Sequence, residues 1–463
     1  MPSAVSLSEV LAALSYALDL TEGQPAGHTL RACLVGMRLA SELGLDPEQQ
    51  SALYYALLLK DAGCSSNAAR MASLFGTDDR VVKPALKTVD WHHALVLAFR
   101  TAQVTGRGDG TRGTLADRAR HFWRVARGGE VTRQLIQVRC ERGAGIARRI
   151  GFPEATCGAI RSLDEHWCGL GHPEGLEGAE IPLLARIVNI AQTVEAFHHD
   201  HGLARAMRVV RERRGRWFDP TLADLVLGWR WRGDAGWWRA LEGPDVEARV
   251  RAAEPPDRVR NVDDAGLDEI AFAFAEIIDA KSPYTYQHSA RVAQYAEWLG
   301  ARAGMEGAEL QRLRRAALLH DIGKLGVSNR VLDKEGRLDG DEWAQVRRHP
   351  MYTQEILQRV RAFAGFARDA ALHHEKLDGT GYPWGVGAGE LSPAARILCV
   401  ADIYDALTSD RPYRAALTHE AAMAILREEA GAKLDAAVVR EMGARAGAPQ
   451  RTTTGVESSP QEV

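Results

Sequence analysis

The sequence contains little cysteine and no pattern that uses it. Six cysteines occur in 463 residues, and none lies in a CxxC pair or in the spacing of a disulfide framework. We therefore expect reduced thiols that serve mainly as small core side chains, as is usual in the cytoplasm.

Long hydrophobic runs and a strong charge bias are also missing. No stretch approaches the ~18 apolar residues that a membrane span needs, and the N-terminus lacks the basic start of a signal peptide. The 58 Lys and Arg residues nearly balance the 61 Asp and Glu residues, which gives a formal net charge of −3. These absences argue against membrane and against bulk nucleic acid as partners, and they predict a soluble, cytoplasmic protein.

The alternating pattern of β-strands is absent as well, whereas helical periodicity recurs along the chain. The segments VLAALSYALDL, SALYYALLL and RLRRAALL are examples of this helical pattern. A chain of 463 residues exceeds one typical core. The sequence therefore predicts an all-α protein made of two helical bundles.

Parts of the chain resemble each other. The segment LLLKDAGCSS around Asp61 resembles LLHDIGKLGVS around Asp321. A histidine lies 33 positions before the aspartate in both copies, His28 in the first and His288 in the second. A longer block, GLGHPEGLEGAEIPLLARIVNIAQ, aligns without a gap with GTGYPWGVGAGELSPAARILCVAD further along. We interpret these matches as a tandem duplication of units of roughly 200 residues.

The duplication sets the predicted domain boundaries. The first unit carries extra sequence between Asp61 and Cys140, and a charged segment with a proline pair separates the two units. The C-terminal end is too polar to pack and is expected to be disordered. The predicted division is a first domain at 1–242, a linker at 243–262, a catalytic domain at 263–447 and a tail at 448–463.

The second unit concentrates histidines and aspartates that suit a metal site in combination, although each histidine alone could be an ordinary hydrogen-bonded residue. Imidazoles and carboxylates without thiolates fit manganese, iron or zinc better than calcium or magnesium. Seven ligands are too many for one tetrahedral zinc, and they favour two metals about 3.5–4 Å apart that share a carboxylate. Such a site is suited to hydrolysing a phosphate ester. The candidate ligands are His288, His320, Asp321, His349, His373, His374 and Asp402.

Residues near these ligands are candidates for binding phosphate. Lys324 follows Asp321 by three positions, and we interpret it as a phosphate contact rather than as a solvated lysine. The stretch HHEKLDGTGYPWG adds Asp378 and glycines that let the backbone approach a ligand closely. Arg411 and Arg414 in SDRPYR are either exposed loop charges or a second phosphate clamp.

The combination of HDIGK with HHEKLDGTGYP closely resembles the HD-GYP family of HD-domain phosphohydrolases, which cleave the bacterial second messenger cyclic di-GMP. The likeness covers roughly residues 263–440. It implies an all-helical HD core with two divalent metal ions, iron or manganese. Some members hold a third metal with a glutamate four residues before the first histidine, and Tyr284 at that position argues against a third metal here.

The resemblance also implies roles for single residues. One metal would take His288, His320, Asp321 and Asp402, and the other would take Asp321, His349, His373 and His374. Lys324, Arg411 and Arg414 match family positions that contact substrate phosphate. Asp321 and Lys324 are the predicted catalytic residues. The predicted substrate-binding set is Lys324, Asp378, Gly381, Tyr382, Pro383, Arg411 and Arg414.

The first unit has lost most of this ligand set. His28 and Asp61 are retained, but Lys60 stands where the second unit has His320, and a lysine would put a positive charge where a cation should sit. The other replacements are Cys140 for His349, Leu163-Asp164 for His373-His374, and Gln192 for Asp402. Because the hydrophobic pattern persists, we interpret the first unit as a degenerate HD domain with a regulatory or dimerising role.

Three functions remain open from the sequence. The favoured one is hydrolysis of cyclic di-GMP or a related cyclic dinucleotide. The second is hydrolysis of another nucleotide, against which the GYP turn weighs. The third is a receptor that binds a cyclic dinucleotide with little turnover and acts through partner proteins. The intact ligand set favours an enzyme; a homodimer and signalling partners are both compatible with the sequence.

Overall fold

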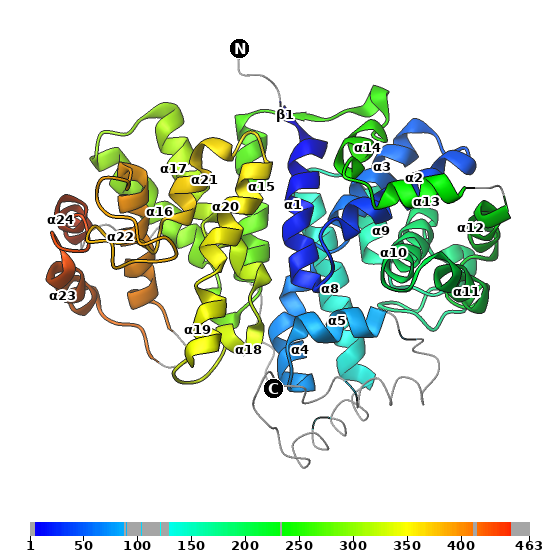
Figure 1. The fold of residues 1–463 in the computed structure, drawn as a ribbon, viewed down its shortest axis with the longest axis horizontal. Helices are drawn as coiled ribbons and strands as arrows, with labels where there is room; N and C mark the ends of the chain where they lie inside the picture. Colours follow the sequence, from blue (N-terminus) through cyan, green and yellow to red (C-terminus); the bar gives the residue numbers. More distant parts are fainter. Residues whose placement is uncertain are drawn as a thin grey trace.

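The computed structural model describes residues 5–87, 129–231, 234–410 and 414–445, together with residues 89, 103 and 121. Across these residues the fold is all-α, as the periodicity predicts. The strands described are one short antiparallel pair, β1 (Val5–Ser6) and β2 (Asn261–Val262). Two groups of helices lie side by side (Figure 1).

The helices of the first half pack around α2, α3 and α10. Helix α3 shows how the sequence specifies its elements: Asp46 caps its start in a capping box with Gln49, and the apolar run that follows is buried against α2, α9 and α10. The main helices of this half are α1 (Leu7–Glu22), α2 (His28–Glu42), α3 (Pro47–Leu59), α4 (Ala68–Phe75), α5 (Asp79–Lys87), α8 (Gly129–Arg149), α9 (Glu154–Arg161), α10 (Leu183–His201), α11 (Leu203–Arg213), α12 (Pro220–Trp231) and α13 (Ala235–Leu241).

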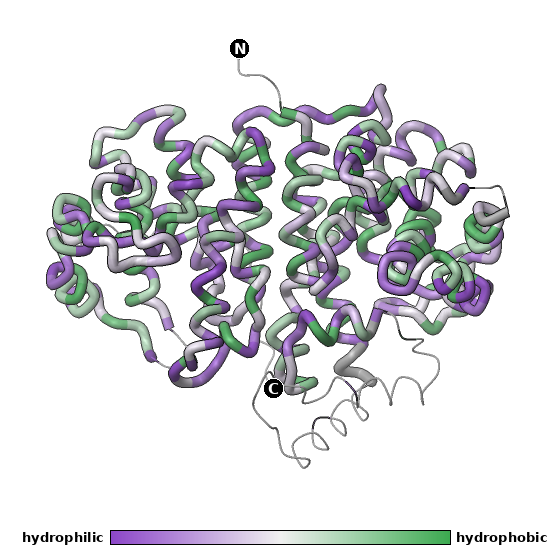
Figure 2. The backbone as a smooth tube through the Cα atoms, in the orientation of Figure 1, coloured by the Kyte–Doolittle hydropathy of each residue, from purple (hydrophilic) through white to green (hydrophobic). Residues whose placement is uncertain are grey.

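The second half repeats the amphipathic design, and hydrophilic and hydrophobic residues alternate along its helices (Figure 2). Its most extensive contacts join α16 to α17 and α20 to α21. Its elements are α15 (Asp264–Asp279), α16 (His288–Arg302), α17 (Gly307–Leu319), the 3₁₀ helix η5 (Ile322–Gly326), α18 (Asn329–Leu332), α19 (Gly340–Val346), α20 (His349–Arg359), α21 (Ala364–Ala371), α22 (Pro393–Thr408), α23 (His419–Glu429) and α24 (Ala436–Ala444).

The two halves share one continuous hydrophobic core. Helix α1 of the first half packs against η5 and α20 of the second half. The guanidinium of Arg80 in α5 donates a hydrogen bond to the backbone carbonyl of Gly326 at the end of η5. The first half therefore touches the short helix that directly follows Asp321.

The segment expected to be a linker, 243–262, is folded and packed. It contains α14 (Val246–Ala252), and Val250 in that helix is fully buried. The carboxylate of Glu254 accepts hydrogen bonds from the hydroxyls of Ser8 and Tyr55. Most charged residues of this segment are exposed or half-buried, whereas Val250 and Glu254 are buried. The predicted tail at 448–463 lies outside the described residues.

Shortening Val250 to alanine tests whether this segment belongs to the core. We expect Val250→Ala to lower the free energy of unfolding by about 2 kcal/mol, because it removes buried methyl groups and leaves a cavity. Val259→Ala, in the same segment but 45% exposed, should change it by less than about 0.5 kcal/mol. Urea denaturation of the two variants measures both values, and equal effects would contradict the packing described here.

Candidate metal centre

The structure brings all seven predicted ligands together in the second half. Six of them lie at helix ends, and Asp402 lies inside α22. His288 and His349 begin α16 and α20, His320 and Asp321 join α17 to η5, and His373 and His374 follow α21. The convergence of these helix ends brings together residues that are far apart in the chain.

The carboxylate of Asp321 lies between two groups of histidines. Its Oδ2 is 3.5 Å from Nε2 of His288 and 3.3 Å from Nε2 of His320. Its Oδ1 is 3.3 Å from Nε2 of His349 and 3.7 Å from Nε2 of His373. Two ligand atoms that each lie about 2.1 Å from one cation are about 3.0–3.4 Å apart at octahedral or tetrahedral angles, so these separations suit one cation on each side.

Asp402 contributes a second carboxylate to the cluster. Its Oδ1 lies 3.4 Å from Nε2 of His288 and 3.8 Å from Nε2 of His320. Its Oδ2 lies 3.8 Å from Nδ1 of His374. Asp402 therefore faces the same pair of histidines as Oδ2 of Asp321.

The other nitrogen of four histidines is held by a hydrogen bond that fixes the ring. Nδ1 of His320, His349 and His373 each lies 2.7–2.8 Å from the backbone carbonyl three residues earlier. Nδ1 of His288 lies 2.7 Å from Oδ2 of Asp405. A carbonyl acceptor places the proton on Nδ1, so Nε2 presents its lone pair to the centre, as in metal-ligating histidines.

Several buried atoms at the centre lack a partner. Within the described part of the chain, Nε2 of His288, Nε2 of His320 and Oδ1 of Asp321 are buried and have no hydrogen bond. A buried polar atom without a partner is costly, and native structures contain few of them. Divalent cations on the two sides of the Asp321 carboxylate would satisfy these three atoms. The residues present therefore fit a metal.

Burial and nearby charges set the protonation of the ligands. Burial lowers the pKa of His373 to about 3 and also lowers that of His349, so both rings are neutral at pH 7. Burial alone would raise the pKa of Asp321, but His320 and Lys324 hold it well below its usual range. Burial lowers the pKa of His320 and Asp321 raises it more, to about 9. A cation must displace that proton, so metal affinity should fall as the pH falls.

The predicted phosphate-binding residues differ in where they lie. Lys324 reaches the cluster, because its Nζ donates to Oδ2 of Asp321 at 2.6 Å. Arg414 instead donates to the backbone carbonyls of Ala406 and Leu407 near the end of α22. Asp378 is exposed and accepts a hydrogen bond from the backbone of Thr380. Arg411 lies outside the described residues.

The GYP turn packs onto the cluster. The ring of Tyr382 stacks on that of His374, with centroids 4.6 Å apart. A Cβ at Gly381 would lie 2.4 Å from Cα of Glu375, so only glycine fits there. The peptide before Pro383 is cis. The carboxylate of Glu375 accepts backbone hydrogen bonds from residues 384–386 and holds the turn in place.

Sequence reasoning missed Asp405 and its partner Arg291. Oδ1 of Asp405 accepts a 2.6 Å hydrogen bond from Nε of Arg291, while Oδ2 orients His288. In the first half, Glu195 contacts His28 and Arg31 in the same arrangement. This pairing was visible in the alignment of the two copies, where Glu195 falls on Asp405, but a carboxylate outside the known motif gave no other signal.

Buried ammonium groups lie among the carboxylates at the corresponding place in the first half. Lys60 donates to Asp61, and Nζ of Lys87 is 2.7 Å from Glu22 and 3.5 Å from Asp61. Glu22, Asp61 and Cys64 are near enough to one another to bind a metal. The pKa of Glu22, which burial raises, is lowered to about 2 by Lys87 and its neighbours. These carboxylates already have cationic partners.

Known proteins are similar to this chain in sequence. A sequence profile of the HD domain matches residues 127–222 and 273–438. A 3′3′-cGAMP-specific phosphodiesterase of Vibrio cholerae is 43% identical over 429 residues, which cover 93% of this chain and 92% of that protein. The chain belongs to the HD-GYP family of HD-domain phosphohydrolases. It is therefore an enzyme of a metal-dependent hydrolase family.

Other relatives support the assignment of this chain to the HD-GYP family. The crystal structure of a cyclic GMP-AMP specific phosphodiesterase of V. cholerae superposes with a TM-score of 0.65 at 36% identity, covering 97% of this chain and 99% of that chain. A cyclic di-GMP phosphodiesterase of Pseudomonas aeruginosa is 41% identical over 132 residues, which are 28% of this chain and 32% of that protein. The likeness to the V. cholerae proteins thus extends over both halves.

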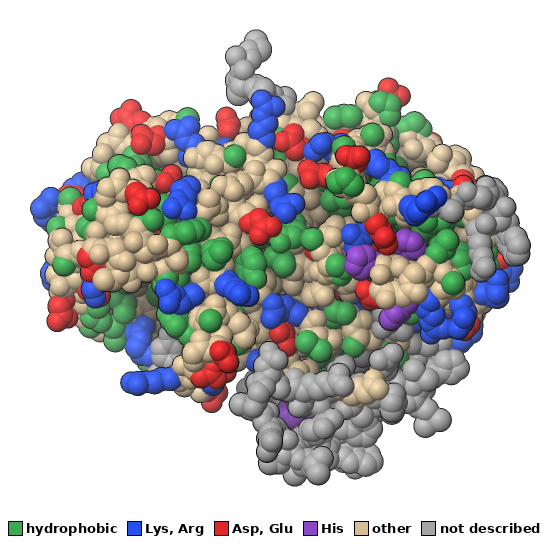
Figure 3. Space-filling view, viewed as in Figure 1, with side chains coloured by type: hydrophobic (Ala, Val, Ile, Leu, Met, Phe, Trp, Pro, Cys, Tyr) green, Lys and Arg blue, Asp and Glu red, His purple; other side chains and the backbone are tan. Residues whose placement is uncertain are grey.

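The surface of the HD-GYP protein carries charges of both signs. Lys and Arg side chains are interspersed with Asp and Glu side chains on the face drawn in Figure 3. None of the helices within the described ranges combines the length and the apolar character needed to cross a membrane.

Replacing Asp321 should empty the centre. We expect Asp321→Ala to lower metal content sharply, because the side chain that faces both histidine groups is lost. Elemental analysis of the purified full chain measures this. The matched control is Asp61→Asn, at the corresponding position of the first half, which should keep the wild-type metal content. Full metal content in Asp321→Ala would contradict the assignment, and so would loss of metal in a folded Asp61→Asn variant.

Proposed function

We propose that this protein hydrolyses a phosphodiester bond of a 3′,3′-cyclic dinucleotide at the cluster around Asp321, with two divalent cations, iron or manganese. The observation that carries the proposal is the position of the Asp321 carboxylate, with one oxygen toward His288 and His320 and the other toward His349 and His373. A carboxylate that faces two sets of imidazoles suits a shared ligand of two metals.

Each cation would have its own set of ligands in addition to Asp321. Bound there, divalent cations lower the pKa of water and neutralise charge on a phosphoryl group. The distances support Asp402 as a ligand on the side of Oδ2, and the contacts of His374 with His349 and His373 support its place on the side of Oδ1. The proposed sets are His288, His320, Asp321 and Asp402 for one cation, and Asp321, His349, His373 and His374 for the other.

The chain's own residues would position the substrate and stabilise the charge that develops on it. Lys324 is 20% exposed at its side chain, next to Asp321, and can donate to a phosphate oxygen as negative charge grows there. Asp405 and Arg291 hold the ring of His288, and Tyr382 holds that of His374. These contacts keep the ligands in one geometry, which spares reorganisation during the reaction.

The comparisons favour a guanine-containing substrate. The V. cholerae relative that spans nearly the whole chain is named for 3′3′-cGAMP, and the P. aeruginosa relative is named for cyclic di-GMP. We therefore propose 3′3′-cGAMP as a candidate substrate together with cyclic di-GMP, the substrate that the motif alone favoured. Both molecules contain guanine and a 3′-linked phosphodiester.

Product analysis decides among the open functions. Manganese- or iron-loaded full chain is incubated with cyclic di-GMP, 3′3′-cGAMP, cyclic di-AMP and a panel of mononucleotides, and products are separated by chromatography. We expect hydrolysis of 3′3′-cGAMP, cyclic di-GMP or both. Hydrolysis confined to another nucleotide would overturn the proposal, and tight binding without products would favour a receptor.

We also propose that the first half is a degenerate copy of the second, with the division at 1–242 and 263–447. A matching pair of hydrogen-bonded residues supports this proposal. Asp19 accepts hydrogen bonds from Thr29, the residue after His28, and Asp279 accepts them from Ser289, the residue after His288. Glu165, like Glu375, accepts backbone hydrogen bonds from the turn that follows it. The lysines that lie among the carboxylates of the first half support a role for that half without metal chemistry.

Removing the ammonium of Lys324 should separate catalysis from metal binding. We expect Lys324→Ala to keep the wild-type metal content and to lower kcat by about 10²-fold or more, as the loss of a charge-stabilising donor does. The matched control is Lys433→Ala, a lysine of the second half whose Nζ pairs with Glu429, which should affect kcat far less. An unchanged kcat in Lys324→Ala would show that this lysine is an ordinary surface charge without a role in catalysis.

A further inference from the structure

One hydroxyl group spans the turn that carries Asp321. The side chain of Thr353, in α20, is fully buried. Its Oγ1 donates a hydrogen bond of 2.7 Å to the backbone carbonyl of His320 and accepts one of 3.1 Å from the backbone N–H of Gly323. A hydroxyl has a single proton to donate, so these contacts use its donor and one of its acceptor positions. Thr353 therefore holds the chain on both sides of Asp321.

The turn lies directly against the start of α20. A Cβ at Gly323 would be 1.9 Å from the carbonyl oxygen of His349 and 2.8 Å from the backbone nitrogen of Thr353. Because no side chain fits into that space, only glycine lets η5 come this close. His349 lies one helical turn before Thr353, on the same face of α20. The hydroxyl thus ties Asp321 to the helix that supplies a histidine on its Oδ1 side.

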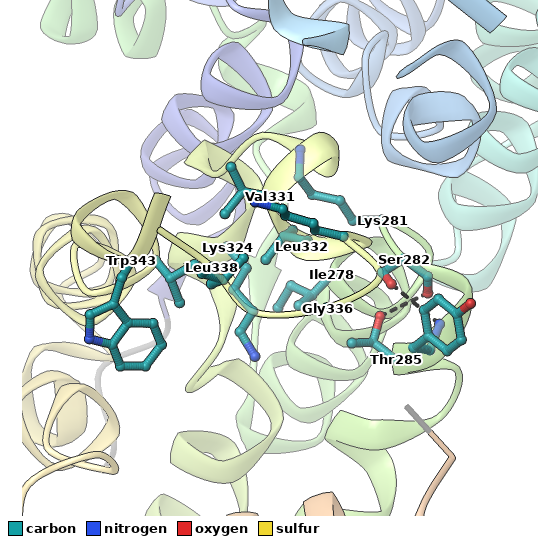
Figure 4. Close-up of a pocket in the computed structure, with 13 residues that line it drawn as sticks. Ile278, Lys281, Ser282, Thr285, Lys324, Val331, Leu332, Gly336, Leu338 and Trp343 are labelled. Carbon is teal, nitrogen blue, oxygen red and sulfur yellow. Dashed lines mark hydrogen bonds between the residues drawn. The ribbon is translucent and has the colours of Figure 1, made fainter. Parts of the chain in front are cut away.

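Lys324 belongs to the same short helix as Gly323. Its Nζ donates to Oδ2 of Asp321 at 2.6 Å. It also lines a pocket of about 210 Å³ (Figure 4). A shift of η5 relative to α20 would therefore move both predicted catalytic side chains, Asp321 and Lys324, relative to the histidines.

The first half has the same close contact but lacks the hydroxyl. A Cβ at Gly63 would be 1.9 Å from the carbonyl oxygen of Arg139 and 2.7 Å from the backbone nitrogen of Gly143. This contact pairs Gly143 with Thr353. It also pairs Arg139 with His349, one residue away from the pairing that the alignment of the two copies suggested. Glycine has no side chain with which to hold the turn.

The turn itself forms without this hydroxyl. In the first half, the N–H of Cys64 donates to the carbonyl of Asp61 at 3.0 Å. In the second half, the N–H of Lys324 donates to the carbonyl of Asp321 at 2.8 Å. The backbone of the turn thus starts in the same way beside a glycine and beside a threonine. The hydroxyl is an addition in the half that carries the full ligand set, which favours a role at the metal centre over a role in forming the turn.

We propose that Thr353 is a positioning residue of the metal centre, whose hydroxyl holds the Asp321 turn against α20 at the spacing that two cations need. This role rests on the proposed metal-dependent function and adds to it a residue that no motif marks. Without the hydroxyl, two buried backbone groups, the carbonyl of His320 and the N–H of Gly323, lose their partner. Groups that orient metal ligands through hydrogen bonds contribute about 10–100-fold to metal affinity or activity.

Removing the hydroxyl tests this role. We expect Thr353→Val, which keeps the shape of the side chain, to weaken manganese binding to the full chain by about tenfold or more, measured by competition with a chelator. It should lower kcat by a similar factor, with a smaller change in KM. Thr353→Ser restores the hydroxyl and should stay within about threefold of the wild type in manganese affinity and kcat. Wild-type manganese affinity in Thr353→Val would overturn the proposal, and so would an equal loss in Thr353→Ser.

The matched control is Thr156→Val in the first half. Thr156 is also fully buried, and its hydroxyl donates to the backbone carbonyl of Ala52 at 3.1 Å. This variant should lower the urea midpoint of the metal-free protein as Thr353→Val does, but it should keep the wild-type manganese affinity. An equal loss of manganese affinity in both variants would overturn the positioning role. If Thr353→Val does not fold, Thr353→Ala is compared with Thr353→Ser, and equal manganese affinity in these two would overturn it.

The proposed activity and the positioning role can fail separately, because manganese binding is measured without a nucleotide. A wild type that hydrolyses no cyclic dinucleotide, with manganese affinity lost in Thr353→Val and kept in Thr353→Ser, would refute the activity and leave the positioning role. A wild type that hydrolyses a cyclic dinucleotide, with unchanged manganese affinity and kcat in Thr353→Val, would refute the positioning role and leave the activity.

Discussion

Buried carboxylates need positive charge beside them, and both halves of this molecule are organised by that requirement. Taking a carboxylate out of water costs several kcal/mol unless a cation compensates it. In the second half, Asp321 and Asp402 face imidazoles whose inward nitrogens are free to bind metal. In the first half, Lys60 and Lys87 bring ammonium groups to Asp61. One fold thus meets the same electrostatic requirement in two ways.

Helix α5 takes part both in the charge cluster of the first half and in the contact between the halves. Lys87 in α5 lies among the carboxylates of the first half. Arg80, earlier in the same helix, donates to the carbonyl of Gly326 in the second half. Helix α5 therefore supplies a cation to the carboxylates of the first half and also contacts the chain that follows Asp321 in the second half.

Much of the site could be predicted from the sequence, because spaced histidines and aspartates limit the chemistry and helical periodicity determines the fold class. The convergence of helix ends on Asp321 could not, since it depends on packing between distant segments. Val250 was hidden in a charged segment whose buried face only the structure reveals. Trp343 carries no motif at all. Its edge-on contact with Tyr382, which stacks on His374, exists only once α19 is placed beside the GYP turn.

Asp79 and Lys281 face each other across the boundary between the halves, with 3.9 Å between their charged atoms. Both are buried, and Asp79 also pairs with Lys83 at 3.2 Å. Removing the carboxylate of Asp79 would therefore deprive two buried ammonium groups of a nearby negative charge. Helix α5 and the second half are therefore not free to diverge independently. Across related sequences, a buried lysine at position 281 should occur only together with an acidic residue at position 79.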